Sequence, residues 1–404
     1  MLENNFILKT KANKTLKNIF FISALVLSTT LSHASTFLQI ESSEPEVRRI
    51  VPPKFEKENI ALKVTKKVQL RAENPVLEVE FKRGKYFISN YGFNDGGWTL
   101  GPASAKYVTD LFIHKFGTTV SKNEPIAVIG RNAQSLFTAL ELKERGYNNI
   151  SVYIESLNDL LNTSDSGIFT TTSTFNEKSK HLFKELGLYS YKYYKEIAQG
   201  KHKYFWVGAK IIPGYFQSRE DADFANFVKA GLMRPAKNVE LDFGNGTTRP
   251  AVMYEDTIFI DAPLLTQKLY ELLKDKGVVF KELKINDVSA LRHKVIVDTS
   301  GVSPDDLVNS RNIYAQQYTM VLKNEYAEDL NYVAYINFGN TVDSFGQTVN
   351  RAFYIHPKRS IDAANAGSVG VIGGSISVGT YTEQSNPEEF NRIIETAREF
   401  YGVR

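Results

Sequence analysis

The sequence contains no cysteine among its 404 residues. This absence excludes disulfide scaffolds, zinc–thiolate and iron–sulfur sites, and cysteine nucleophiles. A strong charge of one sign is also missing, because 49 Lys and Arg stand against 45 Asp and Glu. The resulting net charge of +4 predicts no nucleic-acid partner. The six histidines show no metal-ligand spacing, so no metal site is predicted, and no G-x-S-x-G or P-loop motif occurs.

The first 34 residues have the layout of a secretory signal peptide. A basic region with four lysines precedes an uncharged apolar run at 19–31, and Ser32-His33-Ala34 then supplies a small–x–small site. The run is short for a membrane span, so we predict cleavage near Ala34 and export to the periplasm or the medium. An uncleaved N-terminal anchor is the alternative, and no other membrane contact is predicted. The four lysines and one Glu of this segment account for three of the four net charges.

The rest of the chain divides into seven predicted segments. Residues 35–60 are polar, contain three prolines and are predicted to be a linker. Residues 61–118 contain two strand-like runs, a glycine-rich turn at 90–102 and a helix. Residues 124–180 begin with a strand–helix–strand unit of the length that a dinucleotide site needs. The later segments are predicted as a second lobe at 181–257, an α/β segment at 258–312, a strand-rich segment at 313–381 and a terminal helix at 382–404.

A degenerate dinucleotide motif follows the strand at 126–129. Gly130 supplies the tight turn, Ser135 is small enough for the third glycine position, and Glu155 is the acid after the next strand. Asn132 replaces the second glycine, where the backbone has to approach a pyrophosphate. Taken alone, the motif is equally compatible with a strand–helix–strand unit that binds no ligand.

The C-terminal half resembles the D-amino-acid oxidase family of FAD-dependent oxidoreductases. Ile258 to Leu307 is similar to the family's helix, Gly-Val-x-Phe strand and strand end, and Tyr354-Ile355-His356-Pro357 with Val371-Ile372-Gly373-Gly374 to its "Y-I-x-P … LGG" strand pair. The family's closing elements stand at the front of this chain instead. Val68 to Arg71 resembles its penultimate strand and Asn90 to Gly101 its glycine turn, ahead of a helix from Ala103. This order predicts a circular permutation.

The resemblance implies a set of site residues. It places FAD against the dinucleotide motif, with Ile285 at the adenine and the glycine turn over the flavin ring. Residues 162–167, which match the family's Thr-rich loop, would lie beside the pyrophosphate. The implied cofactor-binding residues are Gly130, Asn132, Ser135, Glu155, Asn162, Thr163, Ser164, Gly167, Ile285, Gly301, Gly97 and Thr99. Tyr354 is implied to line the substrate pocket, with Arg351 on the same strand as a weaker candidate.

Two departures from the family pattern bear on the substrate. Glu78 stands where the family has an arginine that pairs with the substrate carboxylate, and a carboxylate there would favour a cationic amine. Phe93-Asn94-Asp95 stands where the closing turn has His-Gly-Gly. Either the substrate has changed or catalysis has been lost.

The sequence therefore predicts an α/β fold in which a Rossmann-like FAD lobe is interleaved with an antiparallel-rich α+β substrate lobe. The predicted function is an exported FAD-dependent oxidase or dehydrogenase that acts on the CH–NH2 group of a small-molecule substrate. The alternative is a non-catalytic exported protein that keeps the fold as a binding or structural module. The oligomeric state, the electron acceptor and the mode of flavin attachment are left open.

Overall fold

The computed structural model describes most of the chain from Pro45 onward, which belongs to the second of two units, Pro45–Arg404. The described residues are 45–70, 75–93, 97–161, 167–170, 180–222, 224–288, 291–300, 312–323, 330–342, 348–357, 368–378 and 387–403. The predicted signal peptide and the predicted site residues Asn162, Thr163, Ser164 and Gly301 lie outside these ranges. In the described residues, no helix has the length and apolar character needed to cross a membrane.

A six-stranded sheet contains the strand–helix–strand unit. Its order is β11-β6-β5-β12-β4-β3, and all neighbours are parallel except β3, which is antiparallel to β4. The apolar strands β5 and β12 are buried at every residue, as expected at the centre of a parallel sheet. The strands are β3 (Val76–Lys82), β4 (Lys85–Tyr91), β5 (Ile126–Ile129), β6 (Ile150–Ile154), β11 (Val279–Glu282) and β12 (Val295–Asp298).

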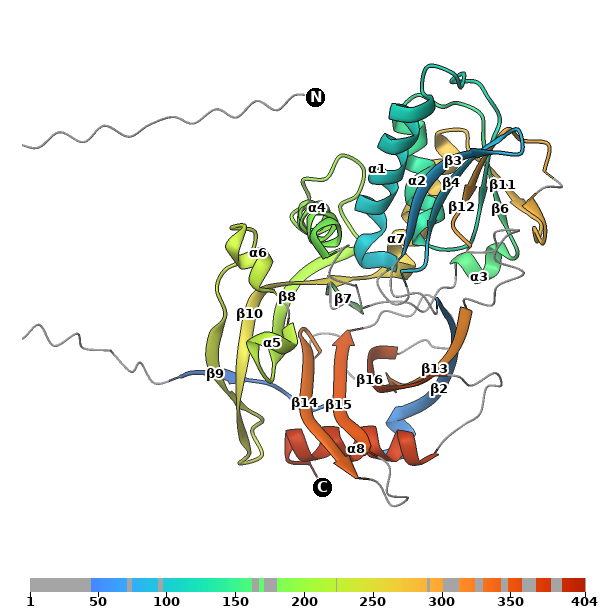
Figure 1. The fold of residues 1–404 in the computed structure, drawn as a ribbon. Coiled ribbons are helices and arrows are strands. Elements are labelled where there is room, and N and C mark those ends of the chain that lie inside the picture. The colour runs from blue at the N-terminus through green and yellow to red at the C-terminus, as the bar shows by residue number, and fades with distance from the viewer. Residues whose placement is uncertain are drawn as a thin grey trace, which may run out of the picture. The chain divides into compact units, whose positions relative to one another are not determined.

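Helices cover one face of this sheet (Figure 1). They are α1 (Gly97–Phe116), α2 (Ala133–Glu144) and α7 (Ala262–Asp275), with the short α3 (Leu157–Leu161) beside α7. Their apolar sides pack with Val128 and Val295 of the sheet in one core. The opposite face packs against Val288 and Leu291, so the parallel strands are enclosed on both sides.

The second sheet has ten strands in the described residues and is mostly antiparallel. Its order is β1-β9-β10-β8-β14-β15-β16-β13-β2, and β7 pairs with β10. The helix α8 (Pro387–Tyr401) packs against β15, β16 and β13 on one face (Figure 1). The strands are β1 (Glu46–Arg49), β2 (Ile60–Leu70), β7 (Gly167–Ile168), β8 (Ala209–Phe216), β9 (Lys237–Asp242), β10 (Thr248–Ile260), β13 (Asn312–Lys323), β14 (Val333–Val342), β15 (Thr348–Pro357) and β16 (Ser368–Val378).

The helix α4 (Lys180–Ala198) connects the two sheets. It contacts α1 on one side and β8 and β10 on the other. Tyr191 and Tyr194 of α4 are buried in the core that also holds Phe216 of β8. One hydrophobic core thus extends across both sheets, and a second lies between the large sheet and α8. The short helices of the described chain are η1 (Lys57–Asn59), α5 (Arg219–Ala222) and α6 (Ala225–Lys229). The predicted α/β class, with a parallel sheet and an antiparallel-rich sheet interleaved along the sequence, is confirmed.

The predicted linker at 35–60 differs from the structure in its described part. β1 pairs in parallel with β9 at the edge of the large sheet, and Ile50 and Phe55 are buried. The prolines and charges of this segment indicated a linker, but these two apolar side chains belong to the hydrophobic core that also contains Phe390 of α8. Residues 45–60 therefore belong to the fold.

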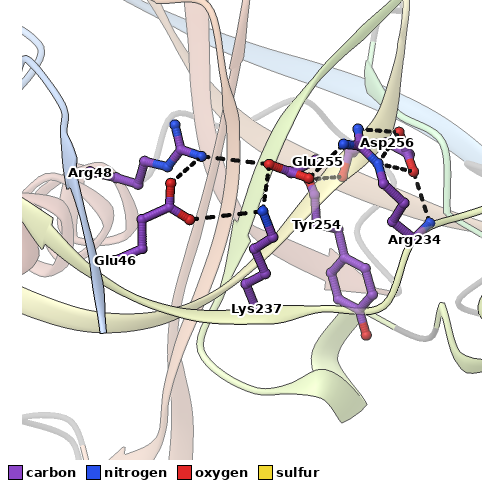
Figure 2. A network of polar contacts seen from close by, with 8 residues as sticks. Glu46, Arg48, Arg234, Lys237, Tyr254, Glu255 and Asp256 are labelled. Carbon is purple, nitrogen blue, oxygen red and sulfur yellow. Dashed lines mark hydrogen bonds and ion pairs between the residues drawn. The ribbon is translucent and has the colours of Figure 1, made fainter. Parts of the chain in front are cut away.

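An ion network holds β1 in place (Figure 2). Arg48 of β1 lies 3.5 Å from Glu255 of β10, which also bonds Arg234 at 2.7 Å and Lys237 at 2.9 Å. The register of β10 shifts between Tyr254 and Thr257, so the neighbours Glu255 and Asp256 both reach Arg234. The network contains three cations and three carboxylates, so its charges balance, which indicates a structural role. Its members are Glu46, Arg48, Arg234, Lys237, Glu255 and Asp256.

Candidate dinucleotide-binding site

The strand order places a switch point between β5 and β12, where open α/β sheets have a crevice outside the carboxyl ends of the strands. From β5 the chain passes through α2 to β6 on one side, whereas β12 lies on the other side of β5. In open α/β sheets, ligands bind at such a switch point, outside the carboxyl ends of the strands. Gly130, Glu155 and Thr299 directly follow β5, β6 and β12, so all three lie at this edge.

Gly130 is fixed by the close approach of Thr299. Its φ is +139°, and an added Cβ would lie 2.0 Å from Thr299 Oγ1. The Thr299 backbone N–H and hydroxyl both donate to the Ile129 carbonyl, at 3.0 and 2.7 Å. Only glycine fits between the two strand ends, and its positive φ allows the tight turn that was predicted after the strand.

Asn132 is the N-cap of α2. Its φ of −126° is extended, so this position does not require glycine. The side-chain Oδ1 accepts from the Ser135 N–H at 3.0 Å, while the Asn132 N–H donates to Ser135 Oγ at 3.3 Å, which completes a capping box. The side-chain Nδ2 donates across the crevice to the Thr299 carbonyl at 2.7 Å. Asn132 and Ser135 are thus in direct contact, and Asn132 also bridges to β12.

Glu155 lies where an acid for a ribose is expected, but it has a partner. Lys284, just after β11, bonds its carboxylate at 2.8 Å, and both side chains are more than half exposed. The hydrogen bond from Lys284 lowers the pKa of Glu155. The next residue, Ile285, is half-buried and packs its side chain on the face of the parallel sheet opposite the helices.

The N-terminus of α1 lies next to that of α2. The side-chain Nε2 of Gln134 donates to the Gly97 carbonyl at 2.8 Å. One turn later, a Cβ on Gly101 would be 2.7 Å from the Phe137 ring, so a small residue lets the helices approach closely. Because parallel strands precede both helices, their positive ends share one edge of the sheet. Gln134 and Thr299 had no assigned role in the sequence interpretation, although both stand within quoted motifs.

The start of α1 differs from the prediction. The glycine-rich turn was expected to run to Pro102, but the helix already begins at Gly97, with the buried Thr99 in its first turn. Pro102 cannot donate to the Trp98 carbonyl four residues earlier. The hydroxyl of Tyr194 donates to that carbonyl instead. Tertiary structure thus satisfies the group that the local sequence leaves without a donor.

Tyr354 lies on the face of β15 that is turned away from α8. Its ring lies over Gly373 of β16, where an added Cβ would be 2.3 Å from the Tyr354 hydroxyl oxygen. The His356 ring is parallel to it, with centroids 5.8 Å apart. Tyr335 is the cross-strand partner of Tyr354 and lies beside Phe216 of β8, in the hydrophobic core that extends across both sheets. This face of β14 and β15 therefore presents aromatic groups.

The other predicted site residues lie elsewhere. Arg351 is three positions from Tyr354, so it projects from the opposite face, where it pairs with Glu399 of α8. It does not share a pocket wall with Tyr354. Glu78 is exposed on β3, the edge strand of the parallel sheet, opposite Ser89. Gly167 begins β7, which pairs with β10. Among the described residues, no group of three or more acidic or histidine side chains is arranged to hold a metal ion.

Comparisons with known proteins give structural resemblances at low identity. No protein-family model and no curated protein sequence matches the chain. Glycine oxidase from Geobacillus kaustophilus is 14% identical with a TM-score of 0.48, over 69% of this chain and 78% of that one. Fructosamine oxidase from Aspergillus fumigatus is 13% identical with a TM-score of 0.45, over 70% and 73%. L-proline dehydrogenase from P. horikoshii is 14% identical with a TM-score of 0.44, over 70% and 78%. Because these scores are below 0.5, the fold class rests on the sheet topology described above.

Proposed function

We propose that this chain is an FAD-dependent oxidoreductase that oxidises an amine or amino-acid-like substrate. The observation that carries the proposal is the bond from Gln134 to Gly97, which holds the positive ends of α1 and α2 together beside the switch point. One helix N-terminus favours a pyrophosphate, and two side by side also favour the negative charge of a reduced flavin.

The crevice residues fit FAD at most positions. Glycine at position 130 leaves room for Thr299 at the strand ends, and we propose that Glu155 would bind a ribose hydroxyl together with Lys284. Gly97 and Thr99 would hold the flavin ring at the start of α1. Asn132 fits only when its side chain turns away from Thr299. Bound FAD would supply hydride acceptance from the substrate carbon.

The substrate would lie against the aromatic face of β14 and β15. Tyr354 and Tyr335 supply flat apolar surfaces with hydroxyl groups at their tips, and His356 adds a polar ring. Such a wall suits a small organic amine.

We further propose that the chain is circularly permuted relative to the D-amino-acid oxidase family. β4 and α1 precede β5 in sequence, yet they lie beside β12 and α2, as the closing strand and helix of that family would. The last described helix lies near the first described segment, since Arg398 of α8 donates to the Phe55 carbonyl at 2.9 Å. Neighbouring ends are the condition under which permutation is tolerated.

Export is part of the same proposal. The basic and apolar pattern of residues 1–34 supports it. N-terminal sequencing of the protein recovered from the periplasm or medium should begin at Ser35. Recovery of the intact N-terminus from the cytoplasm would contradict export.

The activity is tested by mixing purified, flavin-loaded protein anaerobically with a panel of primary amines, secondary amines and D-amino acids. A substrate should bleach the flavin absorbance, and oxygen or an artificial acceptor should restore it. A loaded protein that no member of the panel bleaches would contradict the proposed reaction.

A further inference from the structure

We propose that Asn132 is a latch that sets the affinity of this chain for the pyrophosphate of a dinucleotide. This inference rests on the proposed FAD site. It concerns a residue that sequence reasoning regarded only as a defect in a glycine motif, and the structure gives that residue a specific set of partners.

Both polar atoms of the Asn132 side chain are in use. Oδ1 accepts from the Ser135 N–H at 3.0 Å, and Nδ2 donates to the Thr299 carbonyl at 2.7 Å. One partner is a donor and the other an acceptor, so the orientation of the amide is fixed by chemistry. The side chain therefore crosses from the first turn of α2 to the end of β12, over the switch-point crevice.

A capping role alone does not require asparagine here. Asp, Ser and Asn are comparable N-caps, because each offers an oxygen to a first-turn N–H. Among these three residues, only asparagine has a separate amide group that can donate to the Thr299 carbonyl while its oxygen caps the helix. The bond to Thr299 thus marks this side chain as a bridge between two strand ends rather than a cap alone.

A pyrophosphate would compete with this bridge. It needs first-turn N–H groups of α2 and a close approach to the backbone at position 132. The side chain of Asn132 occupies one such N–H, that of Ser135, and lies over the approach. Binding therefore requires the amide to rotate away and give up two hydrogen bonds. The apparent dissociation constant rises by the reciprocal of the open fraction.

The variant Asn132→Gly opens the latch. Glycine is nearly as good an N-cap, so the variant keeps α2. The dissociation constant for FAD, from quenching of flavin fluorescence, should fall roughly tenfold, as expected when two ordinary hydrogen bonds no longer have to be broken. ADP should gain similarly, whereas adenosine, which has no phosphate, should not. The thermal midpoint of the ligand-free protein should fall at the same time.

Two further variants sharpen the test. Asn245 also makes a two-sided bridge, since its Oδ1 accepts from the Thr247 N–H at 3.0 Å and its Nδ2 donates to the Tyr401 carbonyl at 2.9 Å. Asn245→Gly should lower the thermal midpoint and leave FAD affinity unchanged. Asn132→Asp keeps the cap, loses the donor to Thr299 and adds a negative charge beside the pyrophosphate, so FAD affinity should fall.

The outcomes separate the latch from the proposed function. Wild-type protein that binds FAD, with an Asn132→Gly variant that binds it equally or more weakly, overturns the latch alone. An equal gain for adenosine also overturns it, because the effect would not involve the pyrophosphate. If neither protein binds FAD or ADP, both the latch and the proposed function are wrong. Should Asn132→Gly fail to fold, Asn132→Ser, which keeps the cap and loses the amide donor to Thr299, gives the comparison.

Discussion

Gln134 and Gly97 are joined by a side-chain-to-backbone hydrogen bond of 2.8 Å that ties α2 to the first turn of α1. The two helices are not adjacent in sequence, since β5 and its flanking turns lie between them. The bond therefore fixes the relative position of two helix N-termini. In the proposed site, one faces the pyrophosphate and the other the flavin.

Gln134→Leu should weaken both the fold and the cofactor site. It keeps the apolar volume but leaves the Gly97 carbonyl without this donor, which costs about 1–2 kcal/mol of unfolding free energy. FAD affinity should fall because the α1 N-terminus is no longer fixed. The control is Gln267→Leu on the exposed side of α7, where a surface bond to Glu271 is lost and a change within about 0.5 kcal/mol is expected. Equal urea midpoints for the two variants would show that the Gly97 bond is unimportant.

Tyr194→Phe should destabilise the protein by about 1–3 kcal/mol, because it leaves the Trp98 carbonyl without a donor in the interior. Burial raises the pKa of Tyr194 well above its ordinary value, so the hydroxyl stays protonated as that donor. The adjacent Tyr193 is a matched control. Its hydroxyl is buried and has no hydrogen-bond partner among the described residues. Tyr193→Phe should be neutral or stabilising in thermal unfolding, and a loss as large as that of Tyr194→Phe would contradict this difference.

The ion pairs of Glu144 should make part of the free energy of unfolding depend on pH. Burial would raise its pKa, but hydrogen bonds from Lys203, Tyr204 and Lys276 outweigh burial and lower the pKa from 4.5 to about 2. Because the folded value is the lower one, this stabilisation is complete above pH 4.5 and is lost as the pH falls toward 2. Glu144→Gln should cost about 1 kcal/mol at pH 7. The difference from wild type should vanish near pH 2 in denaturant titrations. A difference that is independent of pH would contradict the ion-pair account.

Reversing the proposed permutation should give a folded protein. The new chain would run from Lys122 to Val403, through about ten Gly and Ser residues spanning about 17 Å, and then from Pro45 to Ser121. The join has to cross about the length of β1, because Asn245, in the turn after β9, bonds the Tyr401 carbonyl at 2.9 Å and the near end of β1 is Arg49, paired with Asp242. Cooperative unfolding near the wild-type midpoint is expected. A chain opened inside the buried β6 should not fold, and equal failure of both would contradict the permutation.

Sequence patterns located most of the elements. The apolar runs 126–129 and 295–297 fall within buried parallel strands, and the terminal helix occupies Pro387–Tyr401 within its predicted segment. The start of α1 was misplaced because Gly97 and Pro102 are turn residues by propensity, whereas the Tyr194 hydroxyl that compensates for Pro102 lies 92 residues further along. Thr299 was missed for a similar reason. Its contact with Asn132 spans 167 positions, and only the sheet order brings the two together.

A fluorescence titration of FAD with the purified, flavin-free protein shows whether the crevice between β5 and β12 binds FAD. We expect saturable quenching with one FAD per chain, reversed by excess ADP and abolished by Gly130→Val, whose side chain would collide with Thr299. Flavin fluorescence that stays unquenched at every protein concentration, or quenching that Gly130→Val leaves intact, would contradict it.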